Sequence, residues 1–292
     1  MKKSKIKILL LMFFAFLLPL QGCIQPGTPE DTDTEEENPG KTYVGCYETA
    51  EYVYQSDVTE SCLTTDLSAE YLLLMNKEQT LGADYIPASL TYLTCPTTKS
   101  IQLETRAAQA LYEMFKEMDA AGVDDVWVTS AYRSYEYQSG LFNYYISLET
   151  NHYANNGDFS TDAYACLGAE YLRVNYLDAG ITRLSTADAR RVVLSYSAEP
   201  GTSEHQTGLC VDFITSGMNG SLTVAFENTE AFAWLKENAY KFGYILRYPK
   251  GKEDITGYTY EPWHYRFVGR EAATDIHFGN LTLEEYLQLA GA

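Results

Sequence analysis

The chain has 292 residues, a formal net charge of −19 and 46% apolar residues. This length leaves room for one domain of moderate size after an N-terminal segment and a linker, and the apolar content is enough for a core. A chain this acidic repels nucleic acid and anionic lipid headgroups, so neither is expected as a partner. Tyrosine occurs 25 times, and we interpret most copies as half-buried surface residues rather than as contacts to sugar or peptide.

Residues 1–22 are predicted to be an export signal. Four lysines precede an apolar run from Ile8 to Leu20, which is short for a membrane span. The run ends at Leu20-Gln21-Gly22-Cys23, which resembles a bacterial lipobox, a signal whose cysteine receives lipid and becomes the mature N-terminus. We therefore expect an exported lipoprotein, anchored through Cys23 to the outer face of a bacterial cytoplasmic membrane. The alternative is an ordinary signal peptide with a chance cysteine.

Three further segments follow the signal. Residues 23–42 carry six acids among prolines and threonines and are predicted to form an extended, self-repelling tether. Residues 43–68 have no clear period and receive no assignment. A single domain is expected over residues 69–292.

The cysteines fit an exported protein. Five follow Cys23 and none forms a CxxC pair, so a zinc site built from cysteines is not expected. Disulfides persist outside the cytosol, and Cys46–Cys62 is the easiest pair by proximity. An odd count leaves at least one thiol free unless it pairs between chains.

Hydrophobic periodicity predicts a mixture of helices and strands in the domain. The amphipathic stretch from Ile101 to Ala121 predicts a helix, as do residues 134–149 and the stretch from Thr229 to Phe242. A capping box at Thr282-Leu283-Glu284-Glu285 opens a last helix. Short apolar runs predict strands at Tyr71–Met75, Val126–Thr129, Val211–Ile214, Tyr244–Arg247 and Trp263–Phe267. Because helices and strands do not alternate strictly, we expect an α+β fold with a largely antiparallel sheet flanked by helices.

Two of the four histidines lie in dense polar surroundings. His205 sits on a predicted loop edge, and Asp212 lies in an apolar strand, where a buried carboxylate needs a cation, a metal or hydrogen-bond donors. His264 opens another strand, three residues after Glu261. Two histidines and one carboxylate are a common catalytic zinc set, and a nearby glutamate outside that set can act as general base. Each pair alone is more often a structural hydrogen bond or a chance motif.

A third polar position follows the strand at Val126–Thr129. Arg133 lies in Ser130-Ala131-Tyr132-Arg133-Ser134, just past the end of that strand. In so acidic a protein this arginine could bind a substrate carboxylate through two hydrogen bonds, or it could form a surface salt bridge. The residues alone do not separate these two readings.

Together these stretches resemble the VanY-type D-alanyl-D-alanine carboxypeptidases, within the group of zinc peptidases that includes lysostaphin-like enzymes and the hedgehog domain. The resemblance rests on SAYRSYEYQ (130–138), PGTSEHQTGLCVDF (200–213), FGYILRYPKGKEDITGYTYEPWHYRFVG (242–269) and LTLEEYL (281–287). It extends in the same order over nearly all of residues 70–290, where LLLMNKEQTLGADYIP (72–87) is similar to the family's opening segment.

The resemblance implies a role for each of these positions. It places the zinc ligands at His205, Asp212 and His264, the catalytic glutamate at Glu261 and a substrate-binding arginine at Arg133. It adds Gln138 and Ser203 as further substrate contacts. The implied activity is zinc-dependent release of the C-terminal D-amino acid, most often D-alanine, from peptidoglycan stem peptides.

Two departures from the family pattern stand out. Cys210 occupies a position where the family usually has a small residue, and it is either a buried thiol or a disulfide partner of Cys166. The stretch between Gln138 and Ser203 is longer than is usual in the family, and residues at about 150–185 are interpreted as an insertion. This insertion is expected to be a lid or wall over the substrate groove, or a surface elaboration. His152 and His277 have no partner motif and are interpreted as non-ligands.

Two rival functions remain open. The same mechanism could act on another bond, in an L,D-carboxypeptidase or an endopeptidase on the same stems. A zinc-containing wall-binding module without turnover is the rival from another class, and the intact Glu261 argues against it.

Overall fold

The computed structural model describes residues 52–63 and 70–291, all within a unit that begins at residue 40. The predicted signal, the acidic tether, Cys23 and Cys46 lie outside these residues. Among the helices of the described part, none combines the length and the apolar character needed to cross a membrane.

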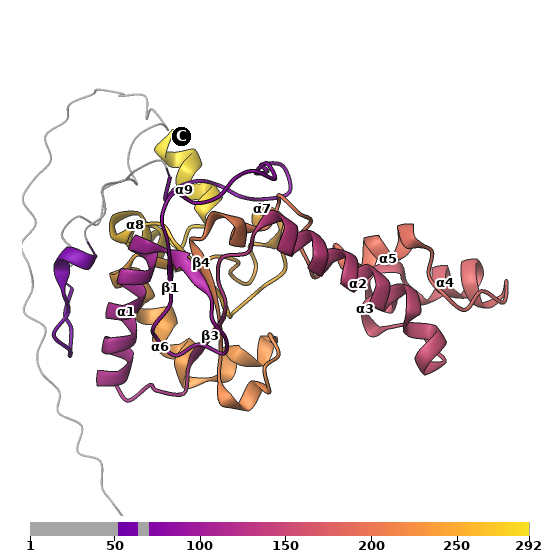
Figure 1. Cartoon of the computed structure of the whole chain (residues 1–292), viewed down its shortest axis with the longest axis horizontal. Helices are drawn as coiled ribbons and strands as arrows, with labels where there is room; N and C mark the ends of the chain where they lie inside the picture. The colour runs from indigo at the N-terminus through magenta and orange to yellow at the C-terminus, as the bar shows by residue number, and fades with distance from the viewer. Residues whose placement is uncertain (1–51, 64–69, 292) are drawn as a thin grey trace, which may run out of the picture. The chain divides into compact units, whose positions relative to one another are not determined.

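A four-stranded antiparallel sheet forms the centre of the domain, with the strand order β3-β4-β6-β5. These strands are β3 (Trp127–Ser130), β4 (Cys210–Ile214), β5 (Tyr244–Leu246) and β6 (His264–Phe267). A separate antiparallel pair consists of β1 (Leu90–Tyr92) and β2 (Gln102–Glu104). Figure 1 shows β3 and β4 side by side, with α1 running along the sheet. The α+β fold with an antiparallel sheet is therefore confirmed.

Nine α-helices occur in the described part of the chain. They are α1 (Thr105–Ala120), α2 (Tyr135–Asn156), α3 (Thr161–Leu167), α4 (Ala169–Leu172), α5 (Thr186–Val193), α6 (Glu230–Asn238), α7 (Glu253–Thr256), α8 (Arg270–Gly279) and α9 (Leu283–Ala290). The predicted capping box is confirmed, because the Thr282 hydroxyl accepts from the Glu285 N–H and the Glu285 carboxylate accepts from the Thr282 N–H.

The two faces of the sheet differ in chemistry. Side chains alternate along a strand, so Val211 and Phe213 of β4 point into the main core, which also contains apolar residues of α1 and α6. Cys210 and Asp212 point to the other face, where β6 contributes His264 and Arg266. The register pairs Asp212 with His264 and Cys210 with Arg266. Although all four are polar, each is at most 3% exposed. The polar face therefore needs an internal partner for every charge.

Two boundaries differ from the sequence prediction. The helix expected from Ile101 begins at Thr105, because residues 102–104 pair with β1 and the Glu104 carboxylate accepts from the Arg106 and Ala107 N–H groups. The helix expected over Thr229–Phe242 is interrupted, since α6 ends at Asn238 and a 3-10 turn covers Ala239–Phe242.

The strand predicted at Tyr71–Met75 is wrong. This segment is a turn followed by irregular backbone. Its carbonyl groups have partners other than a strand: Arg266 donates to those of Tyr71 and Leu73, and Arg247 donates to that of Met75. Two buried guanidinium groups thus donate the hydrogen bonds that a neighbouring strand would otherwise donate to these carbonyls.

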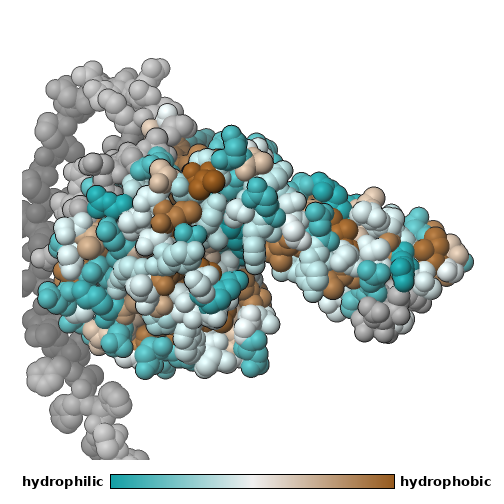
Figure 2. Space-filling view, viewed as in Figure 1, coloured by the Kyte–Doolittle hydropathy of each residue, from teal (hydrophilic) through white to brown (hydrophobic). Residues whose placement is uncertain are grey.

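The stretch predicted as an insertion is helical and has its own core. Helix α5 packs against α2 and α3, and α3 packs against α4; Figure 1 shows these helices gathered together. Buried side chains of these helices and of the segments between them form a cluster separate from the main core, made of Phe159, Ala163, Leu167, Leu172, Tyr176, Leu184, Ala189 and Val192. Figure 2 shows apolar residues scattered among hydrophilic ones on the visible surface of this region.

Candidate active site

The structure brings His205, Asp212 and His264 together on the polar face of the sheet. His205 lies in the 3-10 turn η3 (Glu204–Thr207), and the other two lie opposite one another on β4 and β6. The Nε2 atom of His205 lies 3.1 Å from Oδ2 of Asp212, and the Nδ1 atom of His264 lies 3.0 Å from Oδ1. All three side chains are buried, so their charges need partners within the site.

The second nitrogen of each imidazole has its own partner. Nδ1 of His205 lies 2.7 Å from the carbonyl oxygen of Ala131. Nε2 of His264 lies 2.9 Å from Oε2 of Glu204. Both partners accept hydrogen bonds, so each ring donates on its outer side and turns its other nitrogen toward Asp212. This is the arrangement of metal-binding histidines, whose remaining N–H group is held by an acceptor.

The three residues fit a metal ion. A tetrahedral centre with ligand bonds of about 2.0–2.1 Å places neighbouring donor atoms roughly 3.3 Å apart, close to the two nitrogen–oxygen distances measured here. Without a metal, protons balance the charge. Burial and Arg133 oppose the charged ring, but the Asp212 carboxylate raises the pKa of His205 to about 9. Burial opposes ionisation of Asp212, yet the charge of His205 holds its pKa well below the usual value.

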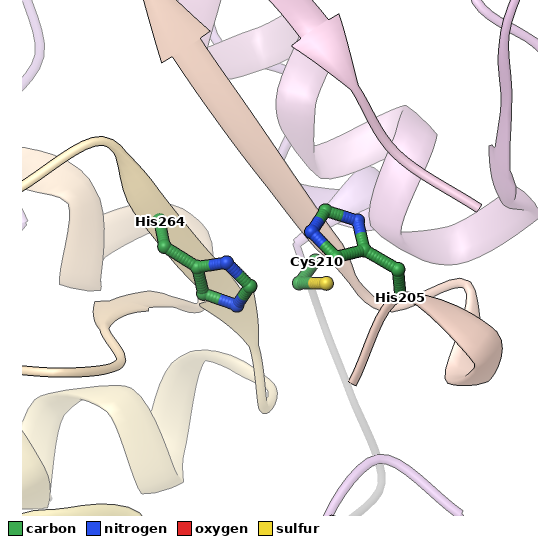
Figure 3. Close-up of side chains that lie close together, drawn as sticks. All are labelled: His205, Cys210 and His264. Carbon is green, nitrogen blue, oxygen red and sulfur yellow. The ribbon is translucent and has the colours of Figure 1, made fainter. Parts of the chain in front are cut away.

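Cys210 shares this space. Its sulfur and one nitrogen of each of His205 and His264 all lie within 4.8 Å of one another, and the three side chains converge in Figure 3. Cys210 is fully buried. It is a free thiol, and the partly buried Cys62, Cys95 and Cys166 are free thiols too. The suggested disulfide between Cys210 and Cys166 is therefore wrong. Cys62 is free in the structure, and its suggested partner Cys46 lies outside the described residues.

Glu261 stands beside the histidine–aspartate group. Its Oε2 lies 3.7 Å from Nδ1 of His264, on the side of the ring that faces Asp212. Pro262 follows it, and the strand β6 begins only at His264, so the chain turns Glu261 toward the same face. Burial raises the pKa of Glu261 to about 7, and the Asp212 carboxylate adds to this rise against the charges of the two histidines. A carboxyl group with such a pKa can accept and return a proton near neutral pH.

Arg133 lies at the end of β3 and faces the same centre. Its guanidinium donates to Ser130 Oγ at 2.9 Å, to Asp212 Oδ2 at 3.1 Å and to Gln138 Oε1 at 3.3 Å. Gln138 in turn donates to the carbonyl of Ala198 at 2.7 Å, which fixes the amide. The arginine is therefore held in place, with 18% of its side chain still open to solvent.

Glu204 was not singled out from the sequence. Its side chain is fully buried, and it accepts from His264, Arg247 and Arg266. Burial opposes its ionisation, but the two guanidinium groups hold the pKa of Glu204 far below the usual value. Its place directly before His205 was the only signal in the sequence, because the two arginines come much later in the chain, Arg247 just after β5 and Arg266 within β6.

A cleft of about 820 Å³ opens over this group. His205, Asp212, Glu261, His264, Arg133 and Ser203 are among the residues that line it. Residues of α2, of α3 and of the segment after α5 also line it, namely Tyr137, Leu141, Tyr145, Asp162, Leu194 and Tyr196. Gln138 lies beneath Arg133 and does not line the cleft. His152 is not among the lining residues, and His277 stacks on Tyr240 with ring centroids 4.1 Å apart.

The raised pKa of Glu261 has a consequence for stability in the metal-free protein. Between about pH 4.5 and about pH 7 the folded state binds more protons at this residue than the unfolded state does, so the free energy of unfolding falls as the pH rises. Glu261→Gln stays neutral and should remove this fall. Urea unfolding of chelator-treated proteins should show the variant gaining stability over the wild type from about pH 5 to about pH 8. Glu136→Gln, at an exposed position of α2, is the control, and parallel curves for wild type and Glu261→Gln would contradict the expectation.

Comparisons with known proteins agree with this geometry. The family model of VanY, described as D-alanyl-D-alanine carboxypeptidase, matches residues 100–270. The chain is 35% identical over 223 residues to YodJ of Bacillus subtilis, covering 74% of this chain and 67% of YodJ. It is 34% identical over 218 residues to a D-alanyl-D-alanine carboxypeptidase of Enterococcus faecalis, covering 74% of this chain and 65% of that protein.

Solved structures show the same fold. The L,D-carboxypeptidase LdcB superposes with a TM-score of 0.58 at 33% identity, over 75% of this chain and 86% of LdcB. A variant of the vancomycin-resistance D,D-pentapeptidase VanY, in complex with Zn(II), superposes with a TM-score of 0.52 at 34% identity, over 75% of this chain and 99% of that one. On the extent of the sequence match and the shared fold, the chain belongs to the VanY family of D-alanyl-D-alanine carboxypeptidases.

Proposed function

We propose that this protein is a zinc-dependent D,D-carboxypeptidase that releases the C-terminal D-alanine from peptidoglycan stem peptides. One observation carries the proposal: two histidines and an aspartate converge beside Glu261 and Arg133, and all five residues line a single cleft. Relatives named as D-alanyl-D-alanine carboxypeptidases and a VanY structure in complex with Zn(II) support it.

The proposal gives each residue one task. His205 would bind zinc through Nε2, His264 through Nδ1 and Asp212 through its carboxylate, since these atoms face one another. Bound zinc would polarise the scissile carbonyl and lower the pKa of a water molecule toward about 7. Glu261 would accept a proton from a water molecule and return it to the leaving amine, a role that its position beside His264 and its raised pKa favour.

Arg133 would bind the free C-terminal carboxylate of the stem peptide. A planar guanidinium can hold a carboxylate through two hydrogen bonds, and Ser130 and Gln138 keep this one oriented. Ser203 would contact the peptide, and its position in the lining of the cleft supports this role. A terminal carboxylate held beside the metal leaves the last peptide bond as the one to be cut.

The first test separates an enzyme from a binding module. Glu261→Gln keeps the shape and removes the base, so it should bind zinc about as well as the wild type while D-alanine release falls on the order of 10²–10⁴-fold. His264→Ala should lose zinc and activity together, because two remaining ligands hold the metal poorly. Zinc content and amino-acid release would be measured side by side on a pentapeptide stem.

Three results would contradict this assignment. Loss of zinc in Glu261→Gln would make Glu261 a ligand, and full zinc retention in His264→Ala would remove His264 from the ligand set. A wild type that holds zinc yet releases no amino acid from any stem would favour a wall-binding module.

A second candidate function uses the same site on a shorter stem. The structural similarity to LdcB, an L,D-carboxypeptidase, favours release of the terminal D-residue from a tetrapeptide. Both reactions present a terminal D-amino acid beside the metal, so the ligand set does not distinguish them. Assaying the purified domain on pentapeptide and tetrapeptide stems in parallel decides between them.

The second test concerns Arg133. Arg133→Ala should weaken binding of stems with free C-termini by about 1.5–3 kcal/mol or more, because a charge-assisted contact is lost. Wild-type activity should fall on stems with amidated ends, and the variant should discriminate less between the two. Arg173→Ala serves as control, since Arg173 pairs with Glu170 and Asp178 and does not line the cleft. Equal wild-type activity on amidated stems would instead favour an endopeptidase.

We also propose that the protein is a membrane-anchored lipoprotein, on the strength of the tetrad that ends at Cys23. Wild-type protein expressed in a bacterium should partition with membranes, and Cys23→Ser should release or mislocalise it. Mass spectrometry of the mature N-terminus checks the modification. Wild-type protein found wholly in the medium with an unmodified N-terminus would overturn the anchor.

A further inference from the structure

One buried carboxylate connects the proposed metal ligands to the rest of the domain. Glu204 lies in η3, directly before His205, and its side chain has no exposed surface. Its two oxygens have different partners. Oε1 accepts from Arg247 Nε at 2.8 Å and from Arg266 Nη1 at 2.6 Å, whereas Oε2 accepts from His264 Nε2 at 2.9 Å.

The chemistry of the groups fixes which atom donates and which accepts in each hydrogen bond of Glu204. Guanidinium groups only donate hydrogen bonds, so Oε1 of Glu204 must accept from both arginines. Their positive charges also favour the ionised form of the carboxylate. An ionised carboxylate has no proton to give, so Nε2 of His264 must carry the proton in the contact with Oε2. A neutral imidazole has a single N–H group, and its lone pair is then on Nδ1. That nitrogen faces Asp212 at 3.0 Å and Glu261 at 3.7 Å.

We propose that Glu204 is a positioning residue that fixes the tautomer of His264, so that Nδ1 is always the nitrogen presented to the metal. The inference rests on the proposed function, since it takes His264 to be a ligand. His205 is fixed differently, by the backbone carbonyl of Ala131, which no substitution of a side chain can reverse. The two imidazoles are therefore held in opposite tautomers, and only that of His264 depends on a side chain.

The two arginines determine which side-chain atom of residue 204 faces His264. Arg266 donates to the carbonyls of Tyr71, Leu73 and Phe267, and Arg247 donates to Glu284 at 2.6 and 2.9 Å. With both guanidinium groups held in this way, a glutamine at position 204 must turn its oxygen to them. Its NH₂ group then faces Nε2 of His264, which has to accept, and the proton moves to Nδ1. The lone pair that faces the metal position is lost.

Glu204→Gln should therefore weaken zinc binding by roughly 10–100-fold, measured by competition with a chelator of known affinity. The matched control is Glu284→Gln, which removes a charge from the other end of the same buried group without contacting His264. The control should lose stability but keep the zinc affinity of the wild type. Equal zinc affinity in folded Glu204→Gln and wild type overturns the inference, and so does an equal loss in both variants.

A measurement on the unaltered protein covers the case in which Glu204→Gln does not fold. In ¹⁵N-labelled, zinc-loaded wild type, long-range ¹H–¹⁵N spectra of the imidazoles should show one ligand ring bound through Nδ1 with Nε2–H, and one with the reverse arrangement. Two rings that both carry Nδ1–H overturn the inference. A wild type that binds no zinc defeats the proposed function itself, whereas tight zinc binding through two Nε2 atoms defeats only the role of Glu204.

Discussion

The pairing of one fully buried carboxylate with two guanidinium groups is the constraint on which the rest of the structure depends. An isolated buried charge is too costly to keep, so Glu204, Arg247 and Arg266 have to be brought together by the fold. The carboxylate comes from the turn before β4, and the arginines come from β6 and the residue after β5. Arg247 also pairs with Glu284 of α9, so the last helix is tied to the same charges. Removing any one partner leaves the others uncompensated in a dry interior.

The sheet separates this charge cluster from the apolar core by the alternation of side chains along its strands. Val211 and Phe213 pack toward α1, while Asp212 between them faces the histidines. A slip of one residue in the pairing of β4 would send Asp212 into the core and Phe213 into the cleft. The register that satisfies the apolar core is thus the same register that sets Asp212 opposite His264.

Local patterns in the sequence predicted much of this arrangement. The apolar strand around Asp212 and the proline after Glu261 act through neighbours in the chain, so the placement of these residues on one face followed from the sequence. The segment at Tyr71–Met75 did not follow, because its carbonyls bind arginines about 170–195 positions later. The role of Glu204 did not follow from the sequence for the same reason, since it depends on two arginines far along the chain and no local pattern indicates them. The start of α1 shifted because Glu104 caps the helix while its own segment pairs with β1.

The helical region from α2 to α5 contributes side chains to the cleft but keeps its buried apolar residues in a cluster of its own. Substitutions in that cluster therefore disturb packing that the catalytic sheet does not share. Such a division means that the outline of the cleft can be altered from this region without repacking the core beneath the sheet. For the engineer, it marks these helices as the part to rebuild when a ligand of another shape is to be admitted.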